Sequence, residues 1–231
     1  MKRSTFYIIT LFPEAFDSYI HSSIIGRAIR DKRIAVKFYN PRDFAKKIGK
    51  NGYIRADSRP YGGGPGMVME AEPVLKAVQK ALRPVRQAHG KQAQGKPVIY
   101  FFDVSGKQFT NRDAREVAKK SGNIVLIAGH YEGVDARVQK ILKAKKVSVG
   151  PYTLTGGELP AMLVIDAVAR QVKGVLGTFE SVEEERVSSS EVYTRPEVLQ
   201  WKGKKYAVPK VLLSGNHKKI EEWKKSKNSE F

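Results

Sequence analysis

The sequence of 231 residues predicts an α/β fold, with a mostly parallel sheet that helices cover on both faces. Apolar runs of strand length alternate with segments of helical pattern through most of the chain. Two runs, 97–102 (PVIYFF) and 123–128 (NIVLIA), are apolar throughout, which is typical of strands buried on both faces. Hydrophobic residues make up 41% of the sequence, enough for a sizeable core.

The chain begins with two predicted strands, 5–12 and 34–39, separated by a helix that starts after Pro13. The apolar face of this helix is expected to carry Ile20, Ile24 and Ile29. The first apolar run follows basic residues, as in a secretion signal, but it is short and lacks a small-residue cleavage site. We therefore interpret it as a buried strand.

A glycine-rich loop, 61–67 (YGGGPGM), has four glycines and one proline in seven residues, which excludes a helix or a strand interior. Two interpretations are open: a tight structural turn, or a loop whose bare backbone approaches a phosphate or a base. A helix over 71–82 is predicted to follow, and then an exposed polar loop over 83–96.

Three further elements complete the predicted α/β domain. They are a helix over 111–122, a strand over 146–150 and a helix over 160–172 with proline in its first turn. Loops beginning at Asp103, Gly129 and Gly150 follow successive strands, at the edge where open parallel sheets bind ligands. One glycine pair is more often an ordinary turn, but three such loops together predict a site for an adenosine-like molecule held by the main chain.

The domain organisation changes after residue 177. We expect an α/β domain over 1–177, a flexible acidic and serine-rich linker over 178–192, and a small basic helical domain over 193–231. One of its helices is predicted to be capped by Asn216.

The net charge of +19 indicates a polyanionic partner, with nucleic acid first and an acidic membrane surface second. A generally lysine-rich composition is the third explanation. No apolar run reaches the roughly 18 residues of a membrane span. The absence of cysteine excludes disulfides, thiol catalysis and cysteine-bound zinc, and it fits a reducing cytoplasm. The four histidines are isolated in the sequence, which argues against a histidine metal site.

Six segments carry a resemblance to a known family. In chain order they are NPRDF, RPYGGGPGMVM, GHYEGVD, TGGELPAM, YTRPEVL and VLLSGNH. Together they resemble the bacterial tRNA (guanine-N1)-methyltransferases, from Ile8 to Trp223. The resemblance implies the trefoil-knotted (SPOUT) fold and an obligate homodimer with active sites between its subunits. It also implies methyl transfer from S-adenosylmethionine to N1 of guanosine 37, 3′ to the tRNA anticodon, and Mg²⁺ dependence with unknown ligands.

The resemblance assigns roles to individual residues. The cofactor contacts carry over to Tyr100, Gly129, Tyr131, Glu132, Gly133, Ser148, Val149, Gly150, Tyr152, Leu154, Gly156 and Gly157. The pocket for the target guanine is bordered by Asp57, Pro65 and Gly66, and the tRNA is held by Arg195, Lys202, Lys204 and Lys205. Arg170 takes the position of the charge-stabilising arginine, and Glu185 that of the general base.

The sequence departs from the family at several positions. The family base is an aspartate, whereas Glu185 stands here within the run 183–185, so a neighbouring glutamate or a merely solvated acidic linker are alternatives. The linker is about four residues shorter than in the family. The first cofactor loop reads FFDVSG where the family usually has a Ser/Thr-Pro pair before the glycine, and Pro151 replaces an aspartate. A catalytically impaired knotted tRNA-binding protein is therefore the alternative function. A methyltransferase for another RNA or nucleotide is a third, which the glycine-rich loop and YTRPEVL disfavour.

Overall fold

The structure, a computed structural model, describes residues 3–48, 53–87, 96–176 and 191–227. The chain divides into two compact units, Met1–Leu176 and Gly177–Phe231. The first unit is built on a five-stranded sheet in the order β2-β1-β8-β7-β9, in which every neighbouring pair is parallel. Its strands are β1 (Ser4–Ile9), β2 (Ile34–Tyr39), β7 (Val98–Gln108), β8 (Asn123–Ile127) and β9 (Lys145–Ser148). The predicted parallel α/β fold is confirmed.

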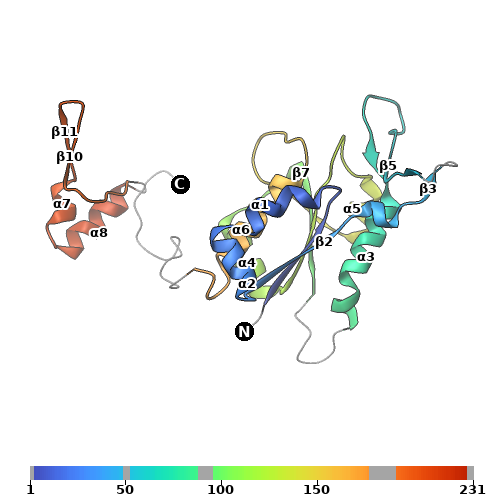
Figure 1. Ribbon diagram of the computed structural model, residues 1–231, viewed down its shortest axis with the longest axis horizontal. Helices are drawn as coiled ribbons and strands as arrows, with labels where there is room; N and C mark the ends of the chain where they lie inside the picture. The colour runs from blue at the N-terminus through green and yellow to red at the C-terminus, as the bar shows by residue number, and fades with distance from the viewer. Residues whose placement is uncertain (1–2, 49–52, 88–95, 177–190, 228–231) are drawn as a thin grey trace. The chain divides into compact units, whose positions relative to one another are not determined.

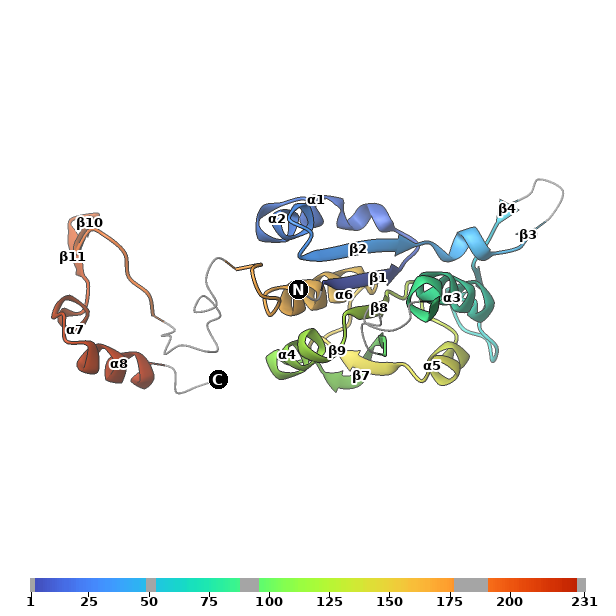
Figure 2. The same cartoon turned by 90° about the horizontal axis from the view of Figure 1, so that it is seen from below.

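Helices cover both faces of this sheet (Figures 1 and 2). One face carries η1 (Pro13–Phe16), α1 (Asp17–Ile20), α2 (Ser23–Arg30), α4 (Asn111–Lys120) and α6 (Glu158–Ala169). The other carries η2 (Pro41–Phe44), α3 (Ala71–Gln87) and α5 (Ala136–Leu142). Alternate residues of β1 and β8 enter the two hydrophobic cores: Phe6 and Leu126 enter one, and Ile9 and Ile127 the other. This two-sided burial explains why β8 is apolar from residue 124 to residue 127.

The helix predicted after Pro13 is broken into three short pieces, and the expected position of Ile24 is wrong. Ile24 is 40% exposed, whereas Ile25 is 4% exposed and enters the core. Ser23 has a φ of 47°, in the left-handed region, so the chain turns before α2 and the helical phase starts again. Ile20 and Ile29 do pack against the core, as predicted.

Helix α3 runs five residues beyond its predicted end at residue 82, so the loop expected from residue 83 is wrong as far as Gln87. Pro84 lies inside the helix, where its missing N–H removes one backbone hydrogen bond. Val85 packs against the core, and its burial favours continuation of the helix past the proline. Residues 88–95 of the expected loop lie outside the described residues.

Strand β7 continues through the segment that was predicted to be a loop after residue 102. Its pairing with β9 shifts register between Phe102 and Lys107, both of which lie opposite Val147, so the residues between them form a bulge. Gly106 lies within this bulge, where a Cβ would come within 2.6 Å of the Val147 nitrogen. Glycine at this position therefore permits the close approach of β7 and β9.

The second unit contains a hairpin that the prediction of a helical domain missed. Strands β10 (Val198–Trp201) and β11 (Lys204–Ala207) pair antiparallel, and helices α7 (Lys210–Leu213) and α8 (His217–Ser226) follow. The predicted cap of α8 is confirmed, because the Asn216 side chain accepts a hydrogen bond of 3.2 Å from the Lys219 nitrogen.

Candidate functional site

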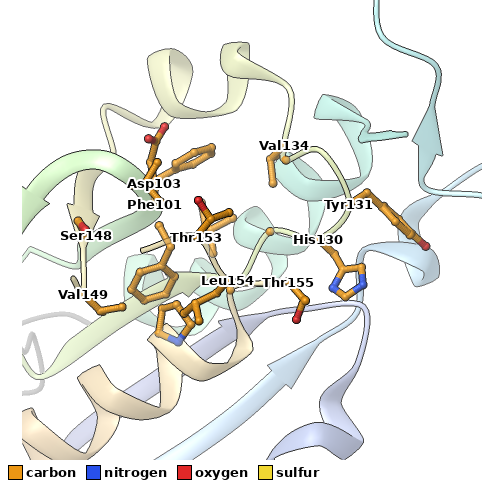
Figure 3. Close-up of a pocket in the computed structure, with 18 of the residues that line it drawn as sticks. Phe101, Asp103, His130, Tyr131, Val134, Ser148, Val149, Thr153, Leu154 and Thr155 are labelled. Carbon is orange, nitrogen blue, oxygen red and sulfur yellow. The ribbon is translucent and has the colours of Figure 1, made fainter. Parts of the chain in front are cut away.

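A cavity of about 350 Å³ lies at the carboxyl ends of β7, β8 and β9, where the three glycine-containing loops were predicted to form a site. Figure 3 shows Phe101, Val149 and Leu154 as apolar parts of its lining. Hydroxyl groups of Ser148, Thr153 and Thr155 lie among them. The cavity therefore combines apolar walls with a few polar groups, which is typical of a small-molecule site.

Tight backbone packing forms the floor of this cavity. The Gly157 nitrogen donates a hydrogen bond of 2.7 Å to the Gly129 carbonyl, and it joins the loop after β8 to the turn before α6. A Cβ on Gly157 would lie 2.5 Å from the Ala128 Cα and 2.7 Å from the Gly129 nitrogen. These contacts explain the glycine at 157 by packing within the protein, in addition to any contact with a ligand.

The buried carboxylate of Glu158 connects the segments that form the same floor, and it was not predicted from the sequence. Glu158 is 8% exposed, and its Oε1 accepts a hydrogen bond of 2.8 Å from the Thr10 hydroxyl. Its Oε2 lies 3.7 Å from Nδ1 of His130, and the Phe12 ring packs against that imidazole. The signals in the sequence are a polar Thr10 in an apolar strand and a glutamate that opens an apolar helix. These contacts join β1, the loop after β8 and α6.

The bulge in β7 places an acidic side chain, that of Asp103, in the wall of the cavity. Oδ1 of Asp103 accepts hydrogen bonds from the Ser105 hydroxyl at 2.7 Å and the Ser105 nitrogen at 2.8 Å. Its Oδ2 lies 2.9 Å from Nζ of Lys146 on β9. The Ser105 hydroxyl and the Lys146 ammonium lower the pKa of Asp103 to about 2. Asp103 is therefore an ionised side chain that holds the bulge against β9.

The glycine-rich loop lies next to the cavity. Its base is closed by strands β5 (Asp57–Ser58) and β6 (Val68–Met69), and its glycines at 62, 63, 64 and 66 all have positive φ. A Cβ on Gly66 would come within 2.6 Å of the Glu132 side chain, which lines the cavity. The Glu132 nitrogen also donates a hydrogen bond of 3.0 Å to the Met67 carbonyl. At 62–64 a Cβ would meet nothing within 4 Å, so there backbone conformation, not close approach, requires glycine.

The three residues expected to border a guanine pocket lie on or beside this loop. Pro65 and Gly66 are exposed, and Gly66 is the one that contacts the cavity wall. Asp57 is half-buried in β5, with its Oδ2 3.5 Å from Nε of Arg55. Both interpretations of the loop are thus compatible with the structure: it is a tight turn, and it borders a cavity.

The structure brings together ten of the twelve residues expected to contact a cofactor. Those that line the cavity are Gly129, Tyr131, Glu132, Gly133, Ser148, Val149, Tyr152, Leu154, Gly156 and Gly157. Tyr100 is buried in the core edge-on to Phe109, and this burial raises its pKa. Gly150 does not line the cavity, and its carbonyl accepts a hydrogen bond of 2.8 Å from the Ser148 hydroxyl.

Of the residues expected to perform catalysis and hold RNA, Arg170 is the one described in the first unit, and it does not line this cavity. Arg170 caps the far end of α6, about 15 Å along the helix axis from Pro160, which lines the cavity. Glu185 lies outside the described residues. Arg195 is exposed in the second unit, where Lys202 is in the turn of the hairpin and the lysines at 204 and 205 are on β11.

Among the described residues, no group of three or more His, Asp or Glu side chains could hold a metal ion. None of the helices in this part of the chain combines the length and the apolar character that crossing a membrane requires.

The sequence matches the family described as tRNA (Guanine-1)-methyltransferase TrmD over residues 4–230. It is 40% identical over 223 residues to a curated tRNA (guanine-N(1)-)-methyltransferase of Pseudoalteromonas atlantica, covering 95% of this chain and 78% of that protein. It is 42% identical over 230 residues to the curated tRNA (guanine-N(1)-)-methyltransferase of Caldanaerobacter subterraneus, covering 98% of this chain and 87% of that protein. A solved tRNA (m1G37) methyltransferase from Aquifex aeolicus is similar with a TM-score of 0.72 and 35% identity, covering 96% of this chain and 88% of that one.

Proposed function

Because this chain belongs to the tRNA (guanine-1)-methyltransferase family, we propose that it transfers a methyl group to N1 of guanosine 37 in tRNA. The observation that carries this proposal is the cavity at the carboxyl edge of the sheet. Its loops hold the segments GHYEGVD and TGGELPAM, and the glycine-rich loop adjoins it at Glu132. The relatives, which are named as enzymes, do not favour the alternative of a catalytically impaired tRNA-binding protein.

We infer that the cavity binds S-adenosylmethionine, which supplies an electrophilic methyl group on a sulfonium. Its volume is within the range of small-molecule sites. Phe101, Val149 and Leu154 offer apolar surface for a nucleoside, and the hydroxyl groups of Thr153 and Thr155 offer hydrogen-bonding partners. The backbone of the glycine-containing loops can approach the ligand closely, because no side chain intervenes there.

The target guanine is proposed to enter between the cavity and the glycine-rich loop. N1 lies on the Watson–Crick edge, so the base must leave its stacked position before the atom is accessible. Gly66 packs directly against Glu132, and the glycines before it leave open space beside the loop. The half-buried carboxylate of Asp57 at the base of the loop is a candidate hydrogen-bond acceptor for the guanine.

Methylation of N1 requires removal of a proton, because the lone pair that attacks the methyl group is released only as the N1 proton leaves. We propose that the Glu185 carboxylate accepts this proton. Negative charge then develops toward O6 of the guanine, and the Arg170 guanidinium is proposed to stabilise it. These two assignments rest on the family resemblance and on the chemistry of the reaction. Mg²⁺ is usually held by one or two carboxylates together with phosphates of the substrate, and the described residues contain no group of three or more His, Asp or Glu side chains that could hold it alone.

A homodimer would reconcile the position of Arg170 with its proposed role. Helix α6 presents Leu159 and Leu163 outward, at 55% and 51% exposure, around a depression that Tyr19 and Arg170 also line. Exposed leucines on one helix face support a protein interface. We propose that a second copy covers this face, so that Arg170 serves a site between the subunits. The trefoil knot stays a prediction.

The exposed cations of the second unit are proposed to hold the tRNA. Arg195, Lys202, Lys204 and Lys205 lie on or next to the hairpin, where phosphates can reach them. Such contacts supply affinity without base specificity. Because tRNA is the proposed substrate, we assign the protein to the cytoplasm.

Transfer of labelled methyl from S-adenosylmethionine to a tRNA transcript tests the proposed function. We expect incorporation into a transcript with guanosine at position 37 and none into the matched transcript with adenosine there, because adenine has an amino group in place of O6, so no negative charge develops there for the Arg170 guanidinium to stabilise. Equal incorporation into both would contradict guanosine 37 as the target. Tight tRNA binding without incorporation would support the alternative of an impaired binding protein.

Asp103 permits a sharper test of the cavity. Asp103→Ala removes the acceptor that holds the bulge, and we expect S-adenosylmethionine to bind about tenfold more weakly, a change of about 1.4 kcal/mol. Asp103→Asn keeps an acceptor for the Ser105 nitrogen and loses only the charge, so the loss should be smaller. Calorimetric titration measures both. Equal affinities for wild type and Asp103→Ala would show that the bulge does not shape the site.

The lowered pKa of Asp103 sets the pH range of its contribution. Because the folded-state pKa is depressed to about 2, the stabilising contacts of the carboxylate are present above the ordinary pKa of an aspartate. They are lost only as the pH falls through about 2. The difference in affinity between wild type and Asp103→Asn should therefore be constant between about pH 5 and pH 8.

A further inference from the structure

The outward face of α3 carries a basic groove that the proposed function does not use. Lys76, Lys80 and Arg83 stand at i, i+4 and i+7, so they follow one stripe of the helix. With Phe44, Gln79 and Gln87, they line a depression of about 550 Å³, which we call the α3 groove. The opposite side of α3 packs in the core, so the groove is the solvent face of a firmly seated helix.

Little negative charge offsets these cations. Glu72 is the nearby acid on α3, and it is shared between Nζ of Lys76 at 2.8 Å and Nζ of Lys46 at 3.7 Å. Within the part of the chain that the structure describes, no carboxylate lies within 4.0 Å of the charged groups of Lys80 or Arg83. The groove therefore has a surplus of positive charge that an anionic ligand would neutralise.

Helix α3 connects the glycine-rich loop to the α3 groove, which begins further along the helix, at Lys76. Helix α3 begins at Ala71, directly after β6, the strand that closes this loop (Figure 1). At 1.5 Å per residue, Lys76 lies about 8 Å from Ala71 along the axis, and Arg83 about 18 Å. The Met69 nitrogen donates a hydrogen bond of 2.9 Å to the Gly133 carbonyl, which fixes the start of α3 to the cavity wall.

We propose that the α3 groove binds the phosphate backbone of the RNA strand next to the target guanosine. This proposal rests on the proposed function, because the RNA is located by the guanine that enters beside the glycine-rich loop. Lys80 and Arg83 would each contact a phosphate, and the amides of Gln79 and Gln87 can donate to phosphate or ribose oxygens. The groove would orient the strand without reading its sequence.

The test compares two double variants that remove equal charge. Lys80→Gln/Arg83→Gln neutralises the groove, and Arg30→Gln/Lys119→Gln neutralises one arginine and one lysine exposed on α2 and α4, across the sheet. Binding of the guanosine-37 transcript is measured between about 50 and 200 mM salt. We expect the groove variant to bind about tenfold more weakly at low salt, with a salt slope smaller by about two. Its melting temperature and affinity for S-adenosylmethionine should equal those of wild type.

The outcomes separate this inference from the function on which it rests. If the groove variant binds tRNA like wild type, or if both variants lose the same affinity, the α3 groove is not a specific contact and the inference is wrong. If the wild-type protein itself does not bind or methylate the transcript, the proposed function fails first. Weaker binding of the groove variant alone supports the inference.

Discussion

Gly157→Ala is expected to abolish binding of S-adenosylmethionine. Gly157 has a φ of −84°, which alanine adopts without strain, so the backbone conformation is no obstacle. The added Cβ would, however, lie 2.5 Å from the Ala128 Cα and 2.7 Å from the Gly129 nitrogen, and both are backbone atoms. The end of β8 and the start of α6 must separate, and the cavity floor opens. Calorimetric titration should show at least a hundredfold loss of affinity, with stability lower by about 1–3 kcal/mol.

Gly156→Ala is the matched control for this substitution. Its Cβ would meet the Glu158 carboxylate and Nδ1 of His130, so these two side chains must shift, but no backbone atom of the floor is displaced. We therefore expect a smaller loss of affinity than for Gly157→Ala. If Gly157→Ala bound the cofactor within about threefold of wild type, the packing of the floor would not be needed for the site.

Glu185→Gln is expected to lower the rate of methyl transfer by about 10²- to 10⁴-fold, the range of general acid–base catalysis. The amide keeps the shape of the side chain but cannot accept the N1 proton. Affinities for S-adenosylmethionine and tRNA should be unchanged, because the base acts only as the proton leaves. Single-turnover incorporation of labelled methyl measures the rate without product release.

The neighbouring glutamates provide internal controls. Glu183→Gln and Glu184→Gln remove the same charge at adjacent positions and should retain the wild-type rate. If one of them lost activity while Glu185→Gln kept it, the base would be that neighbour. Glu185→Asp restores the residue of the family but shortens the side chain by one methylene. Misplacement of a catalytic group by about 1 Å can lower the reaction rate about a hundredfold. The rate of this variant therefore shows whether the backbone is adjusted to the longer side chain of glutamate.

The order of elements could be predicted from the sequence because the apolar runs have strand length and lie between helical patterns. The range 34–39 for β2 is confirmed residue by residue. The misplaced Ile24 follows from the left-handed Ser23, for which the apolar pattern gives no signal. The continuation of α3 past Pro84 depends on burial of Val85, a tertiary contact that overrides the local signal of proline.

The location of the candidate site could also be predicted, because ligands of parallel sheets gather where the strands end. The individual roles came from the resemblance. The contact between Thr10 and Glu158 could not be predicted, since the two residues are 148 positions apart and only the sheet brings them together. The loop beginning at Asp103 was predicted to belong to the site, but the β-bulge that makes this segment part of β7 and of the cavity wall was not.

The hydrogen bond between Thr10 and Glu158 also bears on how the protein matures during translation. Strand β1 is synthesised among the first residues, yet its neighbour β8 begins 114 residues after β1 ends, and Glu158 follows later still. A nascent chain that stops before α6 has no cofactor floor. Pairings this distant in sequence favour slow folding and expose β1 to aggregation while it waits. Ribosome-bound chains truncated before residue 158 should therefore be unable to retain S-adenosylmethionine.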